Sequence, residues 1–492
     1  MKKLLCMLLL LCLLLPAAVL GEEAASAEVK DNLVVTQGSV VIDGKETAYT
    51  ATTGTMALET PLGQYEIFFT AYTANGVEDL TKRPLTFAFN GGPGSASLWL
   101  QMGLLGPQRI DLDENGMIEK IPVGYKPNDC SILDLTDLVF IDPVGTGFSR
   151  ALPGTDEKTF YDYYNDAQSV GDFITLYVSR NGRWGSPKYV AGESYGTTRA
   201  VGVCDYLRNM IHMDLNGLML VSSANDFNVL ESSPGNEMPY VAFLPTFAAA
   251  AWYHKKAAAQ YLEMTLEDYM EEVRGFASGE YLSMLYQGTR ASAEATEATA
   301  EKLAAYIGVD KDYVLQNSLR IEMSDFCAKL LSDQKLMIGR IDSRYTGPVV
   351  AGSIADGASD PSSTGIMEAF NGAYLSYVND MLDYHTDRHY NTLSGEINGA
   401  WNYDTYNTVV AQENTIHDNM SANKFLKVWV LCGYYDLATP FYGAEWIFSH
   451  LFLNEEEAKN LSITYYEAGH MFYLHDPSRN KFREDAKAWF AQ

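Results

Sequence analysis

Residues 188–196 read KYVAGESYG, and this stretch decides which fold the sequence predicts. Its first residues have the character of a strand, and a helical pattern follows Gly196. Between them, the glycines of G-x-S-x-G let the chain turn sharply, so that the hydroxyl of Ser194 projects above a sheet. This strand–turn–helix context predicts a nucleophilic serine. The alternative is an ordinary tight turn with a capping serine.

Short apolar runs elsewhere in the chain have the pattern of strands buried on both faces. They alternate with helical segments such as residues 165–177, which favours a parallel sheet. We therefore predict an α/β-hydrolase fold, in which helices flank a mostly parallel sheet. The other predicted core strands are residues 84–89, 138–141, 218–221 and 426–431.

The predicted core is split by an insertion. Residues 28–227 form its first part and begin with β-hairpins, which the turn signal Asp43-Gly44 supports. Residues 228–423 are rich in Ala, Glu, Tyr and Met, and we expect a mainly helical cap there. Residues 424–492 form the second part of the core.

Residues 1–27 have the pattern of an export signal. Lys2 and Lys3 precede an apolar run, and the small residues Ala25 to Ala27 follow it. Cleavage after Ala27 or after Gly21 leaves a secreted or extracytoplasmic protein without a stable membrane anchor. An uncleaved anchor is the alternative.

The composition of the 492 residues is that of a folded protein, with 47% hydrophobic and 20% charged residues. The formal net charge of −28 argues against nucleic acid as a partner. Removal of residues 1–27 leaves four cysteines, whose spacing fits no metal motif: Cys130, Cys204, Cys327 and Cys432. We expect Cys432, inside an apolar strand, to be a buried thiol.

Two histidines, His385 and His389, are four residues apart and could share a helix face. No third ligand stands near them, so the sequence predicts no metal and no other cofactor. The oligomeric state is left open.

A serine nucleophile needs a base, and that base needs an acid to orient it. In this fold both residues follow the serine along the chain, first the acid and then the histidine. Asp436 comes just after the predicted strand that ends at residue 431. His470 comes just after a predicted strand at residues 463–466, and its rival is His475. We therefore predict that Asp436 orients His470, the base for Ser194. The alternative for Asp436 is a helix cap or turn residue.

The glycine-rich loop at residues 90–94, NGGPG, follows another predicted core strand. Its exposed backbone N–H groups suit one side of an oxyanion hole, with Gly92 and Tyr195 as the two donors. A phosphate-binding loop is the alternative, but the lysine of a P-loop is absent.

Together, these motifs resemble the serine carboxypeptidase family, which includes yeast carboxypeptidase and cathepsin A. The resemblance runs from about Pro84 to His475, and the form Gly433-Tyr434-Tyr435-Asp436 is similar to bacterial members. The stretches that carry it are NGGPG at 90–94, DPVGTGFS at 142–149, GESYG at 192–196, YD at 435–436 and GHM at 469–471.

The resemblance implies release of C-terminal amino acids through an acyl-enzyme, from peptides with a free C-terminus. It also implies that Asn90, Gly91 and Glu193 bind the terminal carboxylate of the peptide. Because two carboxylates cannot both ionise cheaply at close range, Glu193 would favour acidic pH. Met471 is expected to line the substrate pocket, with Tyr240 or Trp252 as candidates from the insertion.

Two positions depart from the family pattern. Ser95 stands where the family usually has a cysteine, and Leu104 stands where many members have a second glutamate, paired with the first. Gln101 could replace that glutamate, and Arg109 or Arg199 could supply positive charge; the alternative for both arginines is a structural ion pair.

Three functions remain open at this point. The first is a secreted serine carboxypeptidase. The second is an esterase or acyltransferase that uses the same three residues. The third is a non-catalytic peptide-binding protein.

Overall fold

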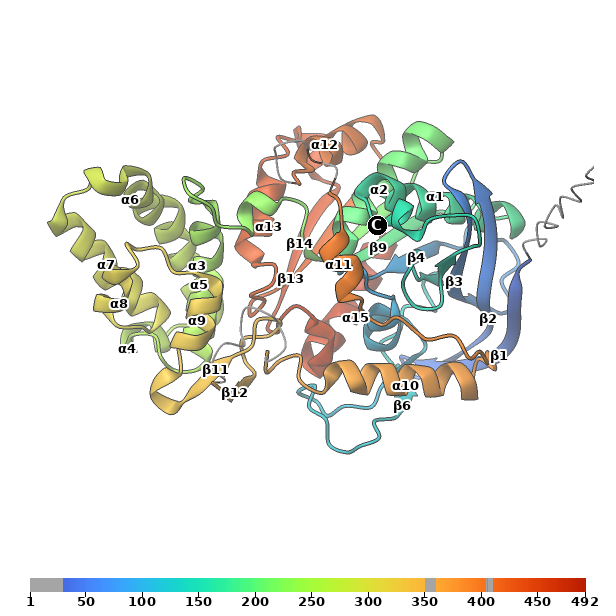
Figure 1. Ribbon diagram of the computed structural model, residues 1–492, viewed down its shortest axis with the longest axis horizontal. Coiled ribbons are helices and arrows are strands. Elements are labelled where there is room, and N and C mark those ends of the chain that lie inside the picture. The colour runs from blue at the N-terminus through green and yellow to red at the C-terminus, as the bar shows by residue number, and fades with distance from the viewer. Residues whose placement is uncertain (1–29, 350–359, 404, 406–409) are drawn as a thin grey trace, which may run out of the picture. The chain divides into compact units, whose positions relative to one another are not determined.

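A ten-stranded sheet runs through the part of the chain that the structure describes (Figure 1). This computed structural model describes residues 30–349, 360–403, 405 and 410–492, and Asp31–Gln492 form one compact unit. The predicted export signal lies outside the described residues. The strands are β1 Asn32–Ile42, β2 Lys45–Thr60, β3 Gly63–Ala74, β4 Leu85–Phe89, β7 Asp137–Ile141, β8 Arg150–Ala151, β9 Lys188–Ser194, β10 Gly217–Ser223, β13 Lys427–Gly433 and β14 Leu461–Tyr466.

The order of the sheet is β1-β2-β3-β7-β4-β9-β10-β13-β14, and β8 pairs with β3. The strands β1 to β3 are antiparallel hairpins, and β3 is also antiparallel to β7. From β7 onward, every neighbouring pair in this order is parallel. The predicted α/β fold is therefore confirmed.

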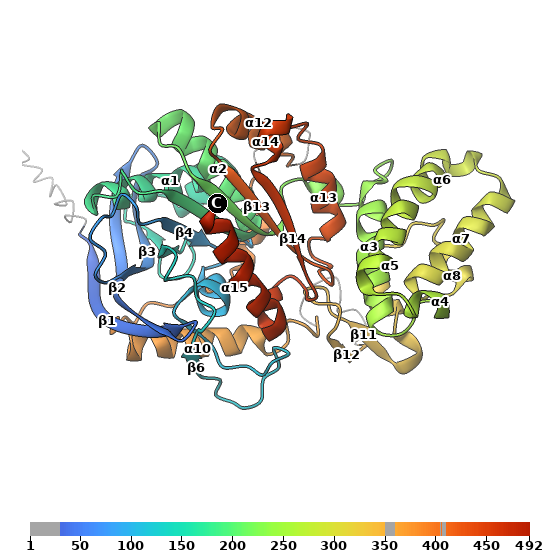
Figure 2. The same cartoon turned by 180° about the vertical axis from the view of Figure 1, so that it is seen from behind.

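Both faces of the parallel strands are buried, which explains their nearly continuous apolar runs. In β10, Leu218 and Leu220 face one apolar cluster, whereas Met219 and Val221 face the other. Helices α1 Tyr163–Arg180, α2 Tyr195–Tyr206 and α13 Phe441–Ser449 contribute to the first cluster. Helices α10 Ile366–Asp380 and α15 Asp476–Ala491 contribute to the second (Figure 2).

The sequence between β10 and β13 is mainly helical. Its first helices are α3 Met238–Tyr253, α4 Ala259–Leu262, α5 Leu266–Phe276, α6 Leu282–Gln287, α7 Ala293–Ile307, α8 Lys311–Gln316 and α9 Met323–Lys329. The short strands β11 Leu336–Ile338 and β12 Thr346–Pro348 then form a hairpin. Helices α10, α11 Gly395–Ala400 and α12 Glu413–Ala422 follow.

Helix α10 lies on the core sheet rather than on the helices α3 to α9. Its Phe370 and Tyr377 are buried in the second cluster, and the Tyr377 hydroxyl lies 2.9 Å from the Tyr72 hydroxyl of β3. One part of the predicted insertion therefore helps to build the core. The remaining β-strands and α-helix of the described residues are β5 Gln108–Ile110, β6 Tyr125–Pro127 and α14 Glu455–Ala458.

The cysteines Cys130, Cys204, Cys327 and Cys432 are buried and unpaired. None of the helices in the described ranges is long and apolar enough to cross a membrane. The same ranges contain no group of three or more His, Cys, Asp or Glu side chains that could hold a metal ion.

Candidate active site

Ser194 lies at the junction between β9 and α2. Its backbone is strained, with φ 61° and ψ −131°, as expected for a sharp strand-to-helix turn. A Cβ atom on Gly192 would lie 2.0 Å from the carbonyl oxygen of Gly196, and one on Gly196 would lie 3.0 Å from that of Phe89. The turn therefore requires a glycine at position 192 and leaves little room for a side chain at position 196, for the steric reason that the sequence indicates.

Asp436 and His470 come together at the ends of two adjacent parallel strands, β13 and β14. His470 Nδ1 lies 2.8 Å from Asp436 Oδ2, and the Asp436 side chain is fully buried. The backbone N–H groups of Ala438 and Thr439 donate to Asp436 Oδ1 at 2.7 and 2.9 Å. These bonds fix the carboxylate toward the imidazole.

His470 and Ser194 line the same two cavities. The two side chains therefore face a common space in which a substrate carbonyl could be attacked. Burial lowers the pKa of His470, but the charge and the hydrogen bond of Asp436 outweigh it, and the net shift is upward. This arrangement favours proton uptake by the imidazole.

The glycine-rich loop approaches the start of α2 closely. A Cβ atom on Gly91 would lie 2.5 Å from the backbone nitrogen of Tyr195, so only glycine fits there. Gly92 has φ 97°, which favours glycine, and lines a cavity together with Ser194 and Tyr195. The two expected oxyanion donors therefore border the same space as the serine.

Glu193 lies inside the protein, directly before Ser194, and is 2% exposed. Asn90 Nδ2 donates to Glu193 Oε2 at 2.8 Å. The hydroxyl of Tyr473 donates to Oε1 and Oε2 of Glu193 at 3.0 and 2.9 Å. Burial raises the pKa of Glu193 to about 7, although the charge of His470 and these hydrogen bonds oppose the shift. Near neutral pH, Glu193 can therefore both hold and release a proton.

Tyr473 is a residue at this site that sequence reasoning missed. It lies three positions after His470, in the short helical turn η8 Phe472–Leu474, and is buried. A Cβ atom on Gly103 would lie 2.3 Å from the ring of Tyr473, so the glycine leaves room for this ring. The sequence signal was a tyrosine close behind the histidine motif.

The other candidates around Glu193 have different partners. Gln101 Nε2 donates to the Tyr72 hydroxyl at 2.8 Å, and Leu104 is buried in an apolar cluster. Arg109 pairs with Asp476 at 3.5 Å. Arg199 pairs with Asp166 at 2.7 Å. Gln101 does not replace the missing glutamate, and both arginines form structural ion pairs.

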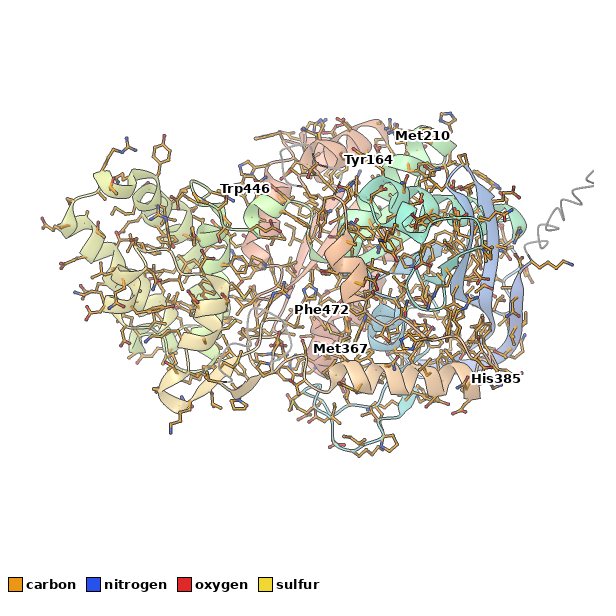
Figure 3. All side chains as sticks on the ribbon, viewed as in Figure 1. Tyr164, Met210, Met367, His385, Trp446 and Phe472 are labelled. Atoms are coloured by element: carbon orange, nitrogen blue, oxygen red, sulfur yellow. The ribbon has the colours of Figure 1, made fainter. Side chains whose placement is uncertain are left out.

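Two cavities meet at Ser194 and His470. The first cavity, about 160 Å³, is lined by Glu193 and has a largely apolar wall. Met471 belongs to this wall, as expected, together with Met367 of α10, which Figure 3 labels. The second cavity, about 680 Å³, extends toward α3 and α9 through Phe243 and Met323. The serine thus stands between a small and a large binding space.

Three sequence candidates lie elsewhere in the described structure. The hydroxyl of Tyr240 donates to Glu322 at 2.7 Å, and the Trp252 ring lies 4.4 Å from the Lys255 ammonium. Neither residue lines the two cavities, and α3 contributes Phe243 to the second cavity instead. His475, the rival base, lies beside Ser478 at the start of α15 and also lines neither.

Ser95, which replaces the usual cysteine, forms a hydrogen bond rather than a disulfide. Its Oγ accepts the Trp99 indole N–H at 2.9 Å, and both residues line the first cavity. This hydrogen bond therefore holds the Trp99 side chain in the wall of the first cavity.

The sheet order and the strained serine turn define an α/β-hydrolase. Residues 47–471 match the family model described as serine carboxypeptidase. The chain therefore belongs to the serine carboxypeptidase family, which confirms the resemblance. Membership of this family makes the protein a serine-type carboxypeptidase that acts on peptides.

This chain is similar to several solved structures. Kex1(Δ)p from Saccharomyces cerevisiae, described as a prohormone-processing carboxypeptidase, matches with a TM-score of 0.57 and 16% identity over 90% of this chain and 91% of that one. A proline iminopeptidase from Mycobacterium smegmatis matches with a TM-score of 0.37 and 14% identity, over 89% of this chain and 98% of its own. A carboxyl esterase from Bacillus coagulans matches with a TM-score of 0.37 and 11% identity, over 89% of this chain and 99% of its own.

Proposed function

We propose that the protein is a secreted carboxypeptidase in which Ser194, His470 and Asp436 cleave the last peptide bond through an acyl-enzyme. The observation that carries this proposal is the first cavity. It brings Ser194 and His470 together with Asn90 and Glu193, which suit a terminal carboxylate. A nucleophile and a carboxylate site in one small space fit removal of a single residue.

In the first step, Ser194 Oγ attacks the carbonyl carbon of the last peptide bond, and His470 Nε2 takes the hydroxyl proton. Asp436 accepts from Nδ1–H, which leaves Nε2 free as the base. The carbon–nitrogen bond then breaks, and His470 returns the proton to the leaving amine. The C-terminal amino acid leaves, and the rest of the peptide stays as an ester on Ser194.

Water completes the cycle in the second step. His470 removes a proton from water, the hydroxide attacks the ester, and Ser194 recovers its proton as the acid product leaves. In both steps a negative oxygen forms on the attacked carbon. The backbone N–H groups of Gly92 and Tyr195 are our candidates to stabilise it, and losing one such donor typically costs about 3 kcal/mol.

The first cavity supports recognition of the C-terminal residue. Asn90, Gly91 and Glu193 bind its carboxylate in this proposal, with the proton on Glu193 shared between the two acids. The side chain of that residue would lie against the apolar wall formed by Trp99, Ile341, Ile366, Met367, Leu393 and Met471. We therefore expect apolar C-terminal residues to be preferred.

Export rests on the sequence of residues 1–27 alone. The pattern of two lysines, an apolar run and small residues supports secretion with cleavage of this segment. N-terminal sequencing of protein recovered outside the producing cells tests it directly.

The test of the activity is mass spectrometry of peptide pairs with a free or an amidated C-terminus. We expect stepwise loss of residues from the free peptide, little from the amide, and no reaction with Ser194→Ala. A fluorophosphonate probe should label the wild type but not this variant. Equal cleavage of both peptides would point instead to an esterase or acyltransferase, and labelling failure in folded protein to a binding protein.

A further inference from the structure

We propose that Tyr473 is a positioning residue that orients the Glu193 carboxyl group toward the terminal carboxylate of the peptide. The inference rests on the proposed function of the first cavity. It assigns a neutral hydroxyl to a place where the family resemblance leads one to expect a second acid.

The contact between the two side chains is close and shared. The Tyr473 hydroxyl lies 3.0 Å from Oε1 and 2.9 Å from Oε2 of Glu193, so it bridges both oxygens. Asn90 is the second partner of Glu193, and its Nδ2 donates to Glu193 Oε2 at 2.8 Å. Both Glu193 and Tyr473 are buried at 2% exposure. Water therefore has little access to take the place of this hydroxyl.

The tyrosine ring is held where it can make this contact. Gly103, in the short π-helix η1 Leu100–Leu105, has no side chain, and a Cβ atom there would lie 2.3 Å from the Tyr473 ring. The next residue, Leu104, is fully buried in the apolar cluster that also contains Tyr473. A glycine and a leucine thus leave space for a ring but offer no acid.

The charged and titratable groups that act on Glu193 are few in the described structure. His470 acts from the loop after β14, Asp436 from the loop after β13, and Tyr473 from η8, whereas Asn90 after β4 is a neutral donor. Burial raises the pKa of Tyr473 well above its usual range, and the Glu193 charge adds to the shift. The hydroxyl therefore stays protonated and can only donate to an ionised Glu193.

This donor role has a consequence for substrate binding. The Tyr473 hydroxyl lies within reach of both Glu193 oxygens but has one proton to donate, so when Glu193 is protonated the other oxygen can carry the acid proton toward the incoming carboxylate. A second carboxylate could take up that proton itself, whereas the Tyr473 hydroxyl, which already carries its own proton, cannot. Tyr473 also stabilises the ionised form of Glu193 in the empty site, which lowers the pH at which Glu193 loses its proton.

The variant Tyr473→Phe removes the hydroxyl and keeps the ring. We expect KM for a peptide with a free C-terminus to rise roughly fivefold at about pH 5.5, the loss typical of one hydrogen bond. KM should also rise as Glu193 loses its proton. In the variant this rise should occur at a higher pH than in the wild type, because ionised Glu193 has lost a hydrogen-bond donor. Hydrolysis of an uncharged ester substrate, which carries no carboxylate, should keep its kcat and KM.

A matched control is Tyr466→Phe. Tyr466 is also buried, but its hydroxyl donates to Asp485 at 3.1 Å, away from Glu193. This variant should show wild-type KM values and the wild-type pH profile. A shift of the same size in both tyrosine variants would mean that loss of any buried hydroxyl explains the effect, and would overturn the proposal.

A second pair of variants isolates the contact. In a Glu193→Gln background there is no carboxylate to titrate, so adding Tyr473→Phe should not move the pH profile of KM. An unchanged KM and pH profile in Tyr473→Phe, with intact release of C-terminal residues, contradicts the role of Tyr473. Absence of such release in the wild type contradicts the proposed function instead.

Discussion

The hydroxyl of Thr439 donates to Asp436 Oδ2 at 2.6 Å, and the same carboxylate accepts the backbone N–H of Thr439 at 2.9 Å. Two bonds from one residue therefore hold the acid in place. The Thr439 Oγ1 atom also lies 3.2 Å from His470 Nδ1. The threonine side chain thus fixes the contact between acid and base from one side.

Removal of this hydroxyl should slow catalysis without weakening binding. In Thr439→Val the Asp436 carboxylate keeps its backbone donors but loses a charge-assisted bond, so we expect kcat to fall about tenfold with little change in KM. The matched variant Thr439→Ser keeps the hydroxyl and should retain most of the wild-type kcat. Steady-state kinetics with a peptide and an ester measure both. Equal rates in Val and Ser variants would contradict this role.

A second prediction concerns the pH dependence of binding. Glu193 has a pKa of about 7 in the empty site, so it is protonated below this pH and ionised above it. Because the ionised form repels a terminal carboxylate, KM for peptides with a free C-terminus should be low below pH 7 and rise above it. The neutral variant Glu193→Gln should have a KM that hardly changes with pH. A rise of the same steepness in this variant would show that another group is titrating.

The positions of Ser194 at the end of a strand and of Asp436 and His470 on loops after strands were predictable, because parallel strands present their carboxyl ends at one edge. Each of these strands has an apolar run that can be read in the sequence. The contact of Glu193 with Tyr473 joins residues 280 positions apart, and its formation depends on the space left by Gly103. No local pattern encodes that space.

The partners of the charged side chains could not be predicted from the sequence either. Arg199 faces Asp166 only because α1 and α2 pack side by side on the sheet. The face of α3 that borders the second cavity depends on the same kind of packing, and it presents Phe243 rather than Tyr240 or Trp252. Side-chain partners of this type follow from tertiary structure, whereas strands and turns follow from local sequence.

A third prediction concerns the choice of the C-terminal residue. Burial of a Leu or Phe side chain against the wall of the first cavity is worth about 1.5–3 kcal/mol, so we expect kcat/KM for such peptides to exceed that for a C-terminal Lys by at least tenfold. Met367→Glu places an acid in this wall and should reduce or reverse the preference. Competition between peptide pairs in one reaction measures the ratio.

The control for this variant is Met381→Glu. Met381 stands just after the end of α10 and is 43% exposed, so an acid there stays in water. Its peptide preference should match the wild type. If both variants change the preference equally, a general effect of added negative charge explains it, and the assignment of the wall to the C-terminal residue is wrong.

The last prediction compares two glycines. A Cβ atom on Gly192 would lie 2.0 Å from the Gly196 carbonyl oxygen, whereas one on Gly275 of α5 would meet nothing within 4 Å. Gly192→Ala must therefore move the backbone of the serine turn, and we expect a loss of about 2–3 kcal/mol of unfolding free energy together with nearly all activity. Gly275→Ala should instead gain about 0.5–1 kcal/mol, because alanine favours an exposed helical position, and should leave kcat unchanged. Urea unfolding and fluorophosphonate labelling of both variants measure these effects. A Gly192→Ala protein as stable and as readily labelled as the wild type would mean that Ser194 does not depend on the tight turn.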